Sequence, residues 1–88
     1  MEEFCDRDGE GQHEAFKRWR EENSDGYVLN CLTAMSFRLH GANCPHWEFD
    51  PMTEVSLTKK RKICSLDKGE LERWATKRGT VAMCRDCF

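Results

Sequence analysis

The sequence has no run of about 20 consecutive apolar residues, the length that a membrane-spanning helix needs. It also lacks the basic and then apolar opening of a secretory signal, because it begins Met1-Glu2-Glu3. Internal repeats and low-complexity segments are absent as well. These absences argue against a membrane protein and against an exported one, so we expect a soluble, cytoplasmic chain.

The chain has 88 residues, which is enough for one domain with a small hydrophobic core. Domains of this size often need a metal ion or disulfides in addition to the core. Six cysteines are present, and in a reducing cytosol such a content indicates metal binding or catalysis rather than a disulfide scaffold. Because the first residues are polar and without periodicity, we expect a flexible N-terminus over 1–9 and a single monomeric domain over 10–88.

Two amphipathic helices are predicted. The first covers about 10–23, where an apolar stripe recurs at helical spacing between charged residues. The members of that stripe are Ala15, Phe16 and Trp19. The second helix is capped by Ser65 or Asp67, with Glu70 in a capping-box position, and Gly79 is a natural C-terminal stop.

Short β-prone runs predict the strands. Those at 27–29, 35–39 and 63–64 give an antiparallel sheet of about three strands. A last strand at 80–83 follows the second helix. The segment 41–57 contains two prolines and little regular pattern, so we predict a long loop there. Together these elements indicate a small α+β domain.

The formal net charge of -2 hides an uneven distribution of charge along the chain. Residues 1–25 carry nine acidic and four basic side chains, whereas 51–88 carry nine basic and five acidic ones. Four of the basic residues are consecutive, namely Lys59, Lys60, Arg61 and Lys62. A basic face of this kind can contact nucleic acid or an acidic protein surface.

Two pairs of residues have the spacing of metal ligands. Cys84 and Cys87 are separated by two residues, so a tight turn can bring both thiolates to one tetrahedral ion. His40 at the end of a predicted strand and Cys44 one short turn later can supply the other two ligands. Zinc suits this mixture of imidazole nitrogen and thiolate sulfur, and four protein ligands make a site structural. We therefore predict that a zinc ion stabilises the domain over 10–88.

Other assignments of these residues are open. Cys64 or His46 could replace His40 as a ligand. A redox role for Cys84 and Cys87 has less support, because no strand-to-helix context of the thioredoxin type follows them. No His/Glu general-base pair stands at an informative spacing, so no catalytic residue is assigned and we do not expect an enzyme.

The order of the motifs resembles a known family. Residues 25–28 (Asp-Gly-Tyr-Val), then His40-x-x-x-Cys44-Pro45, a helix and Cys84-x-x-Cys87 are similar to the N-terminal zinc-binding domain of the bacterial Ada DNA-repair protein. The resemblance covers about 25–87 and implies that both motifs bind one zinc ion. In that family the first cysteine of the Cys-x-x-x-Cys pair accepts a methyl group from a DNA phosphotriester. Here that position is His40, and an imidazole cannot act as the thiolate acceptor.

Three functions follow, in order of preference. The first is a non-catalytic zinc module that binds DNA in a repair, restriction or regulatory context. Its contact residues would be Lys59, Lys60, Arg61, Lys62 and Arg85. The second is a protein-interaction or regulatory module whose loop, with Trp47 and Phe49, contacts a partner. The third is an acceptor of alkyl groups from DNA phosphotriesters through Cys44.

Overall fold

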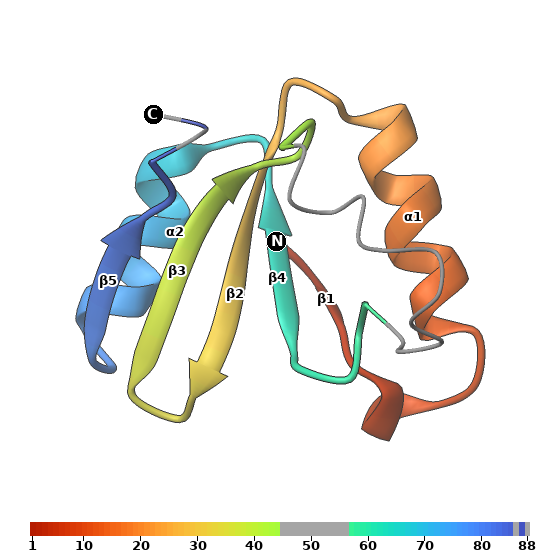
Figure 1. Cartoon of the computed structure of the whole chain (residues 1–88), viewed down its shortest axis with the longest axis horizontal. Coiled ribbons are helices and arrows are strands. Elements are labelled where there is room, and N and C mark those ends of the chain that lie inside the picture. The colour runs from red at the N-terminus through yellow and green to blue at the C-terminus, as the bar shows by residue number, and fades with distance from the viewer. Residues whose placement is uncertain (45–56, 86, 88) are drawn as a thin grey trace.

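The computed structural model describes residues 1–44, 57–85 and 87, and its fold is α+β, as predicted (Figure 1). The described residues form two α-helices, one 3-10 turn and five strands. In chain order these elements are β1 (Glu2–Phe4), η1 (Asp6–Asp8), α1 (Gln12–Glu22), β2 (Tyr27–Thr33), β3 (Ser36–Gly41), β4 (Lys62–Ser65), α2 (Lys68–Thr76) and β5 (Thr80–Met83). Neither helix is long and apolar enough to cross a membrane.

The five strands form one mixed sheet in the spatial order β1-β4-β2-β3-β5. Neighbouring strands are antiparallel except β3 and β5, which are parallel. The prediction of about three antiparallel strands is therefore wrong in the number of strands and in the direction of the last pair. The reason is that α2 carries the chain back to the end of the sheet at which β3 begins, so β5 starts there and runs beside β3 in the same direction (Figure 1).

The central hairpin of β2 and β3 is longer than the sequence predicts. Residues 30–33, expected in the connection, continue β2, and Asn30 and Cys31 pair with Arg38 and Phe37. The turn is therefore short, and Thr33 Oγ1 accepts a hydrogen bond from the amide of Met35 at 3.2 Å. Cross-strand packing extends a strand beyond its locally β-prone run.

The N-terminal segment, for which the sequence predicts flexibility over 1–9, contains β1 and η1 in the structure. β1 adds to the edge of the sheet beside β4, and the ring of Phe4 lies 5.9 Å from that of Phe16. Cys5, which follows β1, is only 4% exposed. The backbone amide of Asp6 donates to the carbonyl of Thr58 at 2.9 Å, and the Thr58 hydroxyl donates to the Asp6 carboxylate. One aromatic ring and a set of long-range hydrogen bonds order a segment that has no periodic pattern.

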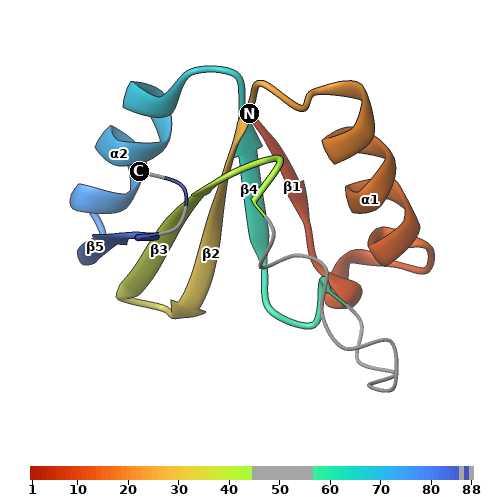
Figure 2. The ribbon, with the colours of Figure 1, turned by 45° about the horizontal axis from the view of Figure 1, so that its top comes forward.

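The sheet has two differently filled faces, since alternate residues of a strand point to opposite sides. On the first, here called the α2 face, a cluster of buried residues packs with α2; its members are Leu29, Phe37, Leu39, Ile63, Leu71 and Ala75. The second, here called the α1 face, joins α1 to the turn after β3; its buried members are Phe16, Trp19, Val28, Ala42, Cys44, Cys64 and Cys84. α1 lies beside β1 at one edge of the sheet, whereas α2 contacts β2, β3, β4 and β5 (Figure 2).

The N-terminus of α2 is capped as the sequence predicts. Asp67 Oδ1 accepts hydrogen bonds from the amides of Gly69 at 2.9 Å and Glu70 at 3.3 Å. Glu70 does not complete a capping box with Asp67, because its carboxylate accepts from the Ser65 hydroxyl at 3.2 Å. Ser65 Oγ in turn accepts from the Asp67 amide at 3.0 Å, so both candidate capping residues are used.

Gly79 permits the contact between the end of α2 and the β2–β3 turn. A Cβ atom at this position would lie 1.9 Å from the carbonyl oxygen of Met35. The next amide, that of Thr80, donates to the same carbonyl at 2.9 Å. The absence of a side chain at Gly79 therefore allows β5 to begin against β3, with Thr80 opposite Ser36. In this register Cys84, which follows β5, lies near the end of β3.

Candidate metal centre

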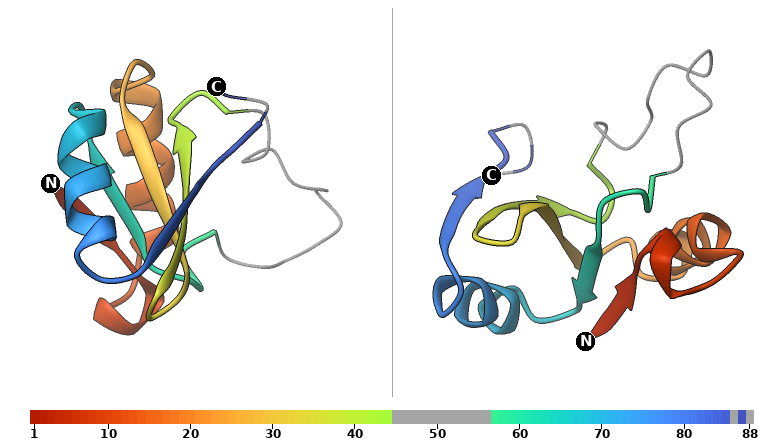
Figure 3. Two further views of the ribbon diagram at one scale, coloured as in Figure 1. Left: turned by 90° about the vertical axis from the view of Figure 1, so that its left-hand side faces the viewer. Right: turned by 90° about the horizontal axis from the view of Figure 1, so that it is seen from below.

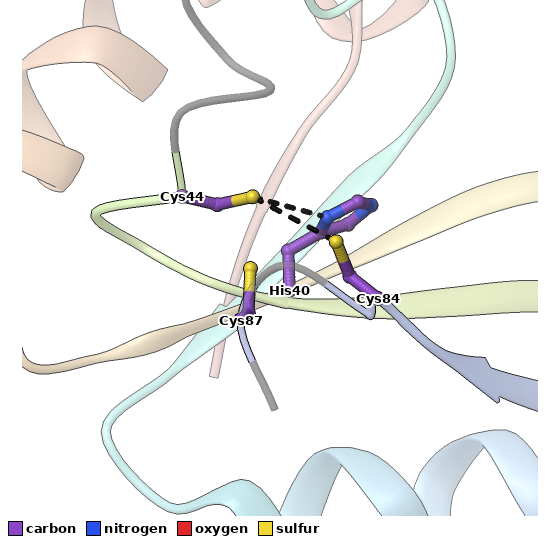
Figure 4. Close-up of side chains that lie close together, drawn as sticks. All are labelled: His40, Cys44, Cys84 and Cys87. Carbon is purple, nitrogen blue, oxygen red and sulfur yellow. Dashed lines mark hydrogen bonds between the residues drawn. The ribbon is translucent and has the colours of Figure 1, made fainter.

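Four side chains converge at the end of the sheet where β3 and β5 terminate (Figure 4). They are His40, Cys44, Cys84 and Cys87, and their ligand atoms all lie within 4.8 Å of one another. His40 belongs to β3, and Cys44 follows that strand after a turn. Cys84 directly follows β5, and Cys87 lies in the next turn. The turn after β3 and the segment after β5 lie side by side although they are far apart in the sequence (Figure 3).

Two distances within this group are close to those of a tetrahedral metal site. Cys44 Sγ lies 3.6 Å from His40 Nδ1 and 3.9 Å from Cys84 Sγ. In a tetrahedral site with metal–ligand bonds of about 2.0 to 2.3 Å, neighbouring ligand atoms are about 3.3 to 3.8 Å apart. The side chains are thus close to the positions that they would hold around one ion. His40 faces the thiolates with Nδ1, which is the nitrogen that would bind the metal.

Backbone hydrogen bonds place the two pairs of ligands. The parallel ladder continues past β5, so that the amide of Cys84 donates to the carbonyl of Leu39 at 2.9 Å and Cys84 lies beside His40. The amide of Cys44 donates to the carbonyl of Gly41 at 3.1 Å, which closes the turn after β3. The amide of Cys87 donates to the carbonyl of Cys84 at 3.3 Å, as in the tight turn predicted for a Cys-x-x-Cys pair.

A second layer of contacts supports the turn that carries Cys44. Ala42, in the middle of this turn, donates its amide to the carbonyl of Gly26 at 2.9 Å. Its own carbonyl accepts a hydrogen bond from Arg20 Nε of α1 at 3.0 Å. Arg20 therefore links the first helix to the metal centre and brings a positive charge towards it. Sequence reasoning did not identify Arg20, because no pattern relates a helical arginine to a turn that follows two later strands.

Burial of this group bears on whether it could hold a cation. The exposed fractions are 2% for Cys44, 3% for Cys84 and 5% for His40, whereas Cys87 is half-buried. Thiolates removed from water in this way are unfavourable unless a positive charge lies beside them. A divalent ion at the centre would supply that charge and would leave no coordination position for water. The arrangement is that of a structural site.

Cys64, a possible substitute ligand, lies outside the group of four. It is 1% exposed on β4, and its cross-strand partner is Val28. Burial raises the pKa of its thiol far above the ordinary value, so Cys64 packs as a neutral, apolar side chain. His46, the other possible substitute, is outside the described residues, as are Trp47 and Phe49.

The run of four basic residues does not form four adjacent surface charges. Lys59 and Lys60 are exposed, and Lys60 Nζ donates to the carbonyl of Leu32 at 3.3 Å. Arg61 makes ion pairs with Glu3 at 3.2 Å and with Asp8 at 2.9 Å. The hydrogen bond to the Asp8 carboxylate raises the pKa of the Arg61 guanidinium. Part of the charge of this run is therefore used within the protein.

Lys62, the last residue of the run, points into the protein. It is 4% exposed, and its ammonium group donates to the carbonyl of Lys60 at 3.0 Å. Burial lowers its pKa to about 8. Arg85, in contrast, is exposed next to Cys84 of the candidate metal centre. Of the five predicted contact residues, Lys59, Lys60 and Arg85 are exposed.

Comparison of the chain with protein-family models, with curated proteins and with solved structures finds no match. The likeness to the Ada zinc-binding domain therefore stays an expectation from the two motifs. What the structure itself provides is a mixed sheet with a group of three cysteines and one histidine that could hold a metal ion.

Proposed function

We propose that the protein is a zinc-stabilised domain in which His40, Cys44, Cys84 and Cys87 bind one Zn²⁺. The observation that carries this proposal is the convergence of four ligand atoms within 4.8 Å. Thiolate and imidazole ligands together favour zinc over hard cations such as Mg²⁺ or Ca²⁺. The ion would connect the turn after β3 to the segment after β5, in addition to the β3–β5 ladder.

The metal content of the purified chain tests this assignment. We expect one zinc per chain, with three sulfur and one nitrogen neighbours by X-ray absorption. Cys84→Ser should lower the zinc content strongly, and Cys31→Ser, outside the group of four, is the matched control. Full zinc binding by Cys84→Ser, or none by the native chain, would contradict the proposal.

We further propose that this domain binds nucleic acid, with the metal serving only the fold. Exposed basic residues precede β4 and follow α2, and the start of β4 and the end of α2 both lie at the end of the sheet opposite the metal centre (Figure 1). They are Lys59, Lys60, Lys77 and Arg78. Arg78 is held in place, because its guanidinium lies 3.9 Å from the centroid of the Trp74 ring and donates to the Trp74 carbonyl at 2.8 Å. Such charges on a rigid scaffold are suited to contacts with phosphates.

A fluorescence titration with short duplex and single-stranded DNA over a salt series tests the second part. Each phosphate contact contributes about 0.9 to the slope of log affinity against log salt for duplex DNA. The double variant Lys59→Gln/Lys60→Gln should therefore reduce this slope by about 2. The matched control is Lys17→Gln/Arg18→Gln, which removes two exposed charges from α1. Equal losses in both variants, or no binding at low salt, would refute a specific basic surface.

The other two predicted functions have less support. The protein-interaction alternative depends on the segment with Trp47 and Phe49, which is outside the described residues. The alkyl-acceptor alternative needs Cys44 to reach a DNA phosphate, and this side chain is only 2% exposed. Neither has a contact in the described residues that favours it over the nucleic-acid module.

A further inference from the structure

Two of the metal-binding cysteines are close enough to react with each other. All six cysteines are reduced in the structure. Cys44 Sγ and Cys84 Sγ lie 3.9 Å apart, both side chains are almost fully buried, and 40 residues separate them in the sequence. Disulfide sulfurs are about 2.05 Å apart, so the two atoms would need to approach by about 2 Å. Cys44 lies in the turn after β3, so its side chain can move towards Cys84 without breaking the ladders of the sheet.

We propose that hydrogen peroxide converts Cys44 and Cys84 into one disulfide and expels the metal ion; this rests on the proposed zinc site. One thiolate attacks the O–O bond of the peroxide, which gives a sulfenic acid and a hydroxide ion. The other thiolate attacks this sulfur, forms the S–S bond and displaces a second hydroxide. The two sulfurs lose two electrons and the peroxide gains them. Zn²⁺ leaves because only His40 and Cys87 remain as ligands.

Cys87 adjoins this pair. It is the half-buried member of the group, whereas Cys44 and Cys84 are 2% and 3% exposed. Its Cβ lies near Gly41, where an added Cβ atom would be 4.0 Å away, so the side chain covers the turn after β3. Cys87 lies in the short turn that follows Cys84. This turn is fixed by the 3.3 Å bond from the Cys87 amide to the Cys84 carbonyl.

The expected bond joins the same two segments that the metal joins. A disulfide between Cys44 and Cys84 would connect the turn after β3 to the segment after β5 and close the loop between them covalently. A disulfide between Cys84 and Cys87 would leave these segments unconnected. The oxidised protein should therefore keep its sheet after the metal has left, which is the distinguishing consequence of this pairing.

Peptide mapping of the full chain tests the pairing directly. Metal content is measured first, and hydrogen peroxide is then added in steps while released zinc is followed with a colorimetric chelator. Trypsin cleaves after Arg38, Lys59, Arg78 and Arg85, so each of the three cysteines of the centre falls in a different peptide. We expect peptide 39–59 linked to 79–85, with one zinc released for each disulfide and with the circular dichroism spectrum retained.

Variants separate the roles of the cysteines. Cys87→Ser should still form the Cys44–Cys84 bond, Cys84→Ser should not, and Cys31→Ser should behave as the native chain. A bond that involves Cys87, or release of zinc without any disulfide, overturns the inference. If a variant does not fold, the peptide map of the native chain decides alone. Absence of zinc before peroxide is added would instead refute the proposed metal site. The peptide map would still test which cysteines pair, because it does not depend on bound zinc.

Discussion

The α2 face and the α1 face of the sheet are stabilised in different ways. On the α2 face, Leu71 and Ala75 of the helix are fully buried against apolar strand residues such as Leu29 and Ile63. On the α1 face, buried aromatic residues of the helix adjoin a region that contains thiols, and the metal centre lies there. The first face can form from hydrophobic burial alone. The second contains buried sulfur and nitrogen atoms that could hold a cation.

If the proposed zinc ion is bound, this difference predicts that the domain combines one metal-independent and one metal-dependent half. In a chain of 88 residues the apolar core is small, and the α1 face uses three cysteines where a larger protein would place larger apolar side chains. Trp74 packs on the α2 face and Trp19 on the α1 face. Their indole N–H signals in NMR spectra therefore report on the two faces separately.

Removal of the metal should give the largest effect and should act through the α1 face. Structural zinc sites contribute about 10 kcal/mol to folding at neutral pH, which exceeds the net stability of most small domains. We expect treatment with a strong chelator to abolish the cooperative thermal melt followed by circular dichroism. The Trp19 signal should be lost first. An unchanged melt of a metal-free chain would show that the two faces do not differ in this way.

Truncation on the α2 face should cost less and should leave the metal bound. Leu71 is fully buried, so Leu71→Ala should lower the free energy of unfolding by about 3 kcal/mol through lost burial and a cavity. Leu66→Ala is the matched control, because Leu66 is 65% exposed. Urea denaturation and zinc content together check this. Loss of zinc from Leu71→Ala would mean that the faces are coupled more tightly than their separate clusters indicate.

Replacement of Lys62 should stabilise the protein. Its pKa of about 8 in the folded state lies below the ordinary 10.5, so burial of the charged form destabilises the fold at neutral pH. We expect Lys62→Met to raise the free energy of unfolding by about 2 kcal/mol at pH 7, after the lost hydrogen bond to Lys60 is included. The free energy of unfolding of the native chain should rise by this difference between about pH 8 and pH 10.5. Over this range Lys62 loses its proton in the folded state but keeps it in the unfolded state.

Urea denaturation at pH 7 and pH 10 measures the effect of Lys62→Met. Lys59→Met, at an exposed lysine of the same run, should change the stability little at either pH. If Lys62→Met raised the free energy of unfolding equally at pH 7 and pH 10, the effect would come from packing and not from the buried charge.

Loss of the cap of α2 should have the smallest effect. Asp67→Ala removes the acceptor for two amides and should lower the stability by about 1 kcal/mol. Asp25→Ala, at an exposed aspartate in the turn after α1, is the comparison. Thermal melts monitored by circular dichroism are sufficient. Equal shifts in the two variants would show that the cap itself contributes nothing measurable.

Local patterns predicted the parts of the fold that local interactions decide. Both helices are present, because helical periodicity and the Asp67 cap involve residues only a few positions apart. The strand at 80–83 and the four convergent ligands were also predicted, the latter from two short spacings. The burial of Lys62 was not predicted, since a lysine in a basic run gives no local signal that its stem will face inward.

The sequence by itself determined the helices and the types and spacing of the metal ligands, because each depends on neighbours within about one turn of the chain. Only the tertiary structure decided that β1 closes one edge of the sheet and that β5 runs parallel to β3. These choices depend on contacts between distant segments, such as the backbone of Gly79 against Met35, for which sequence spacing carries no information. The same contacts place Cys84 beside Cys44.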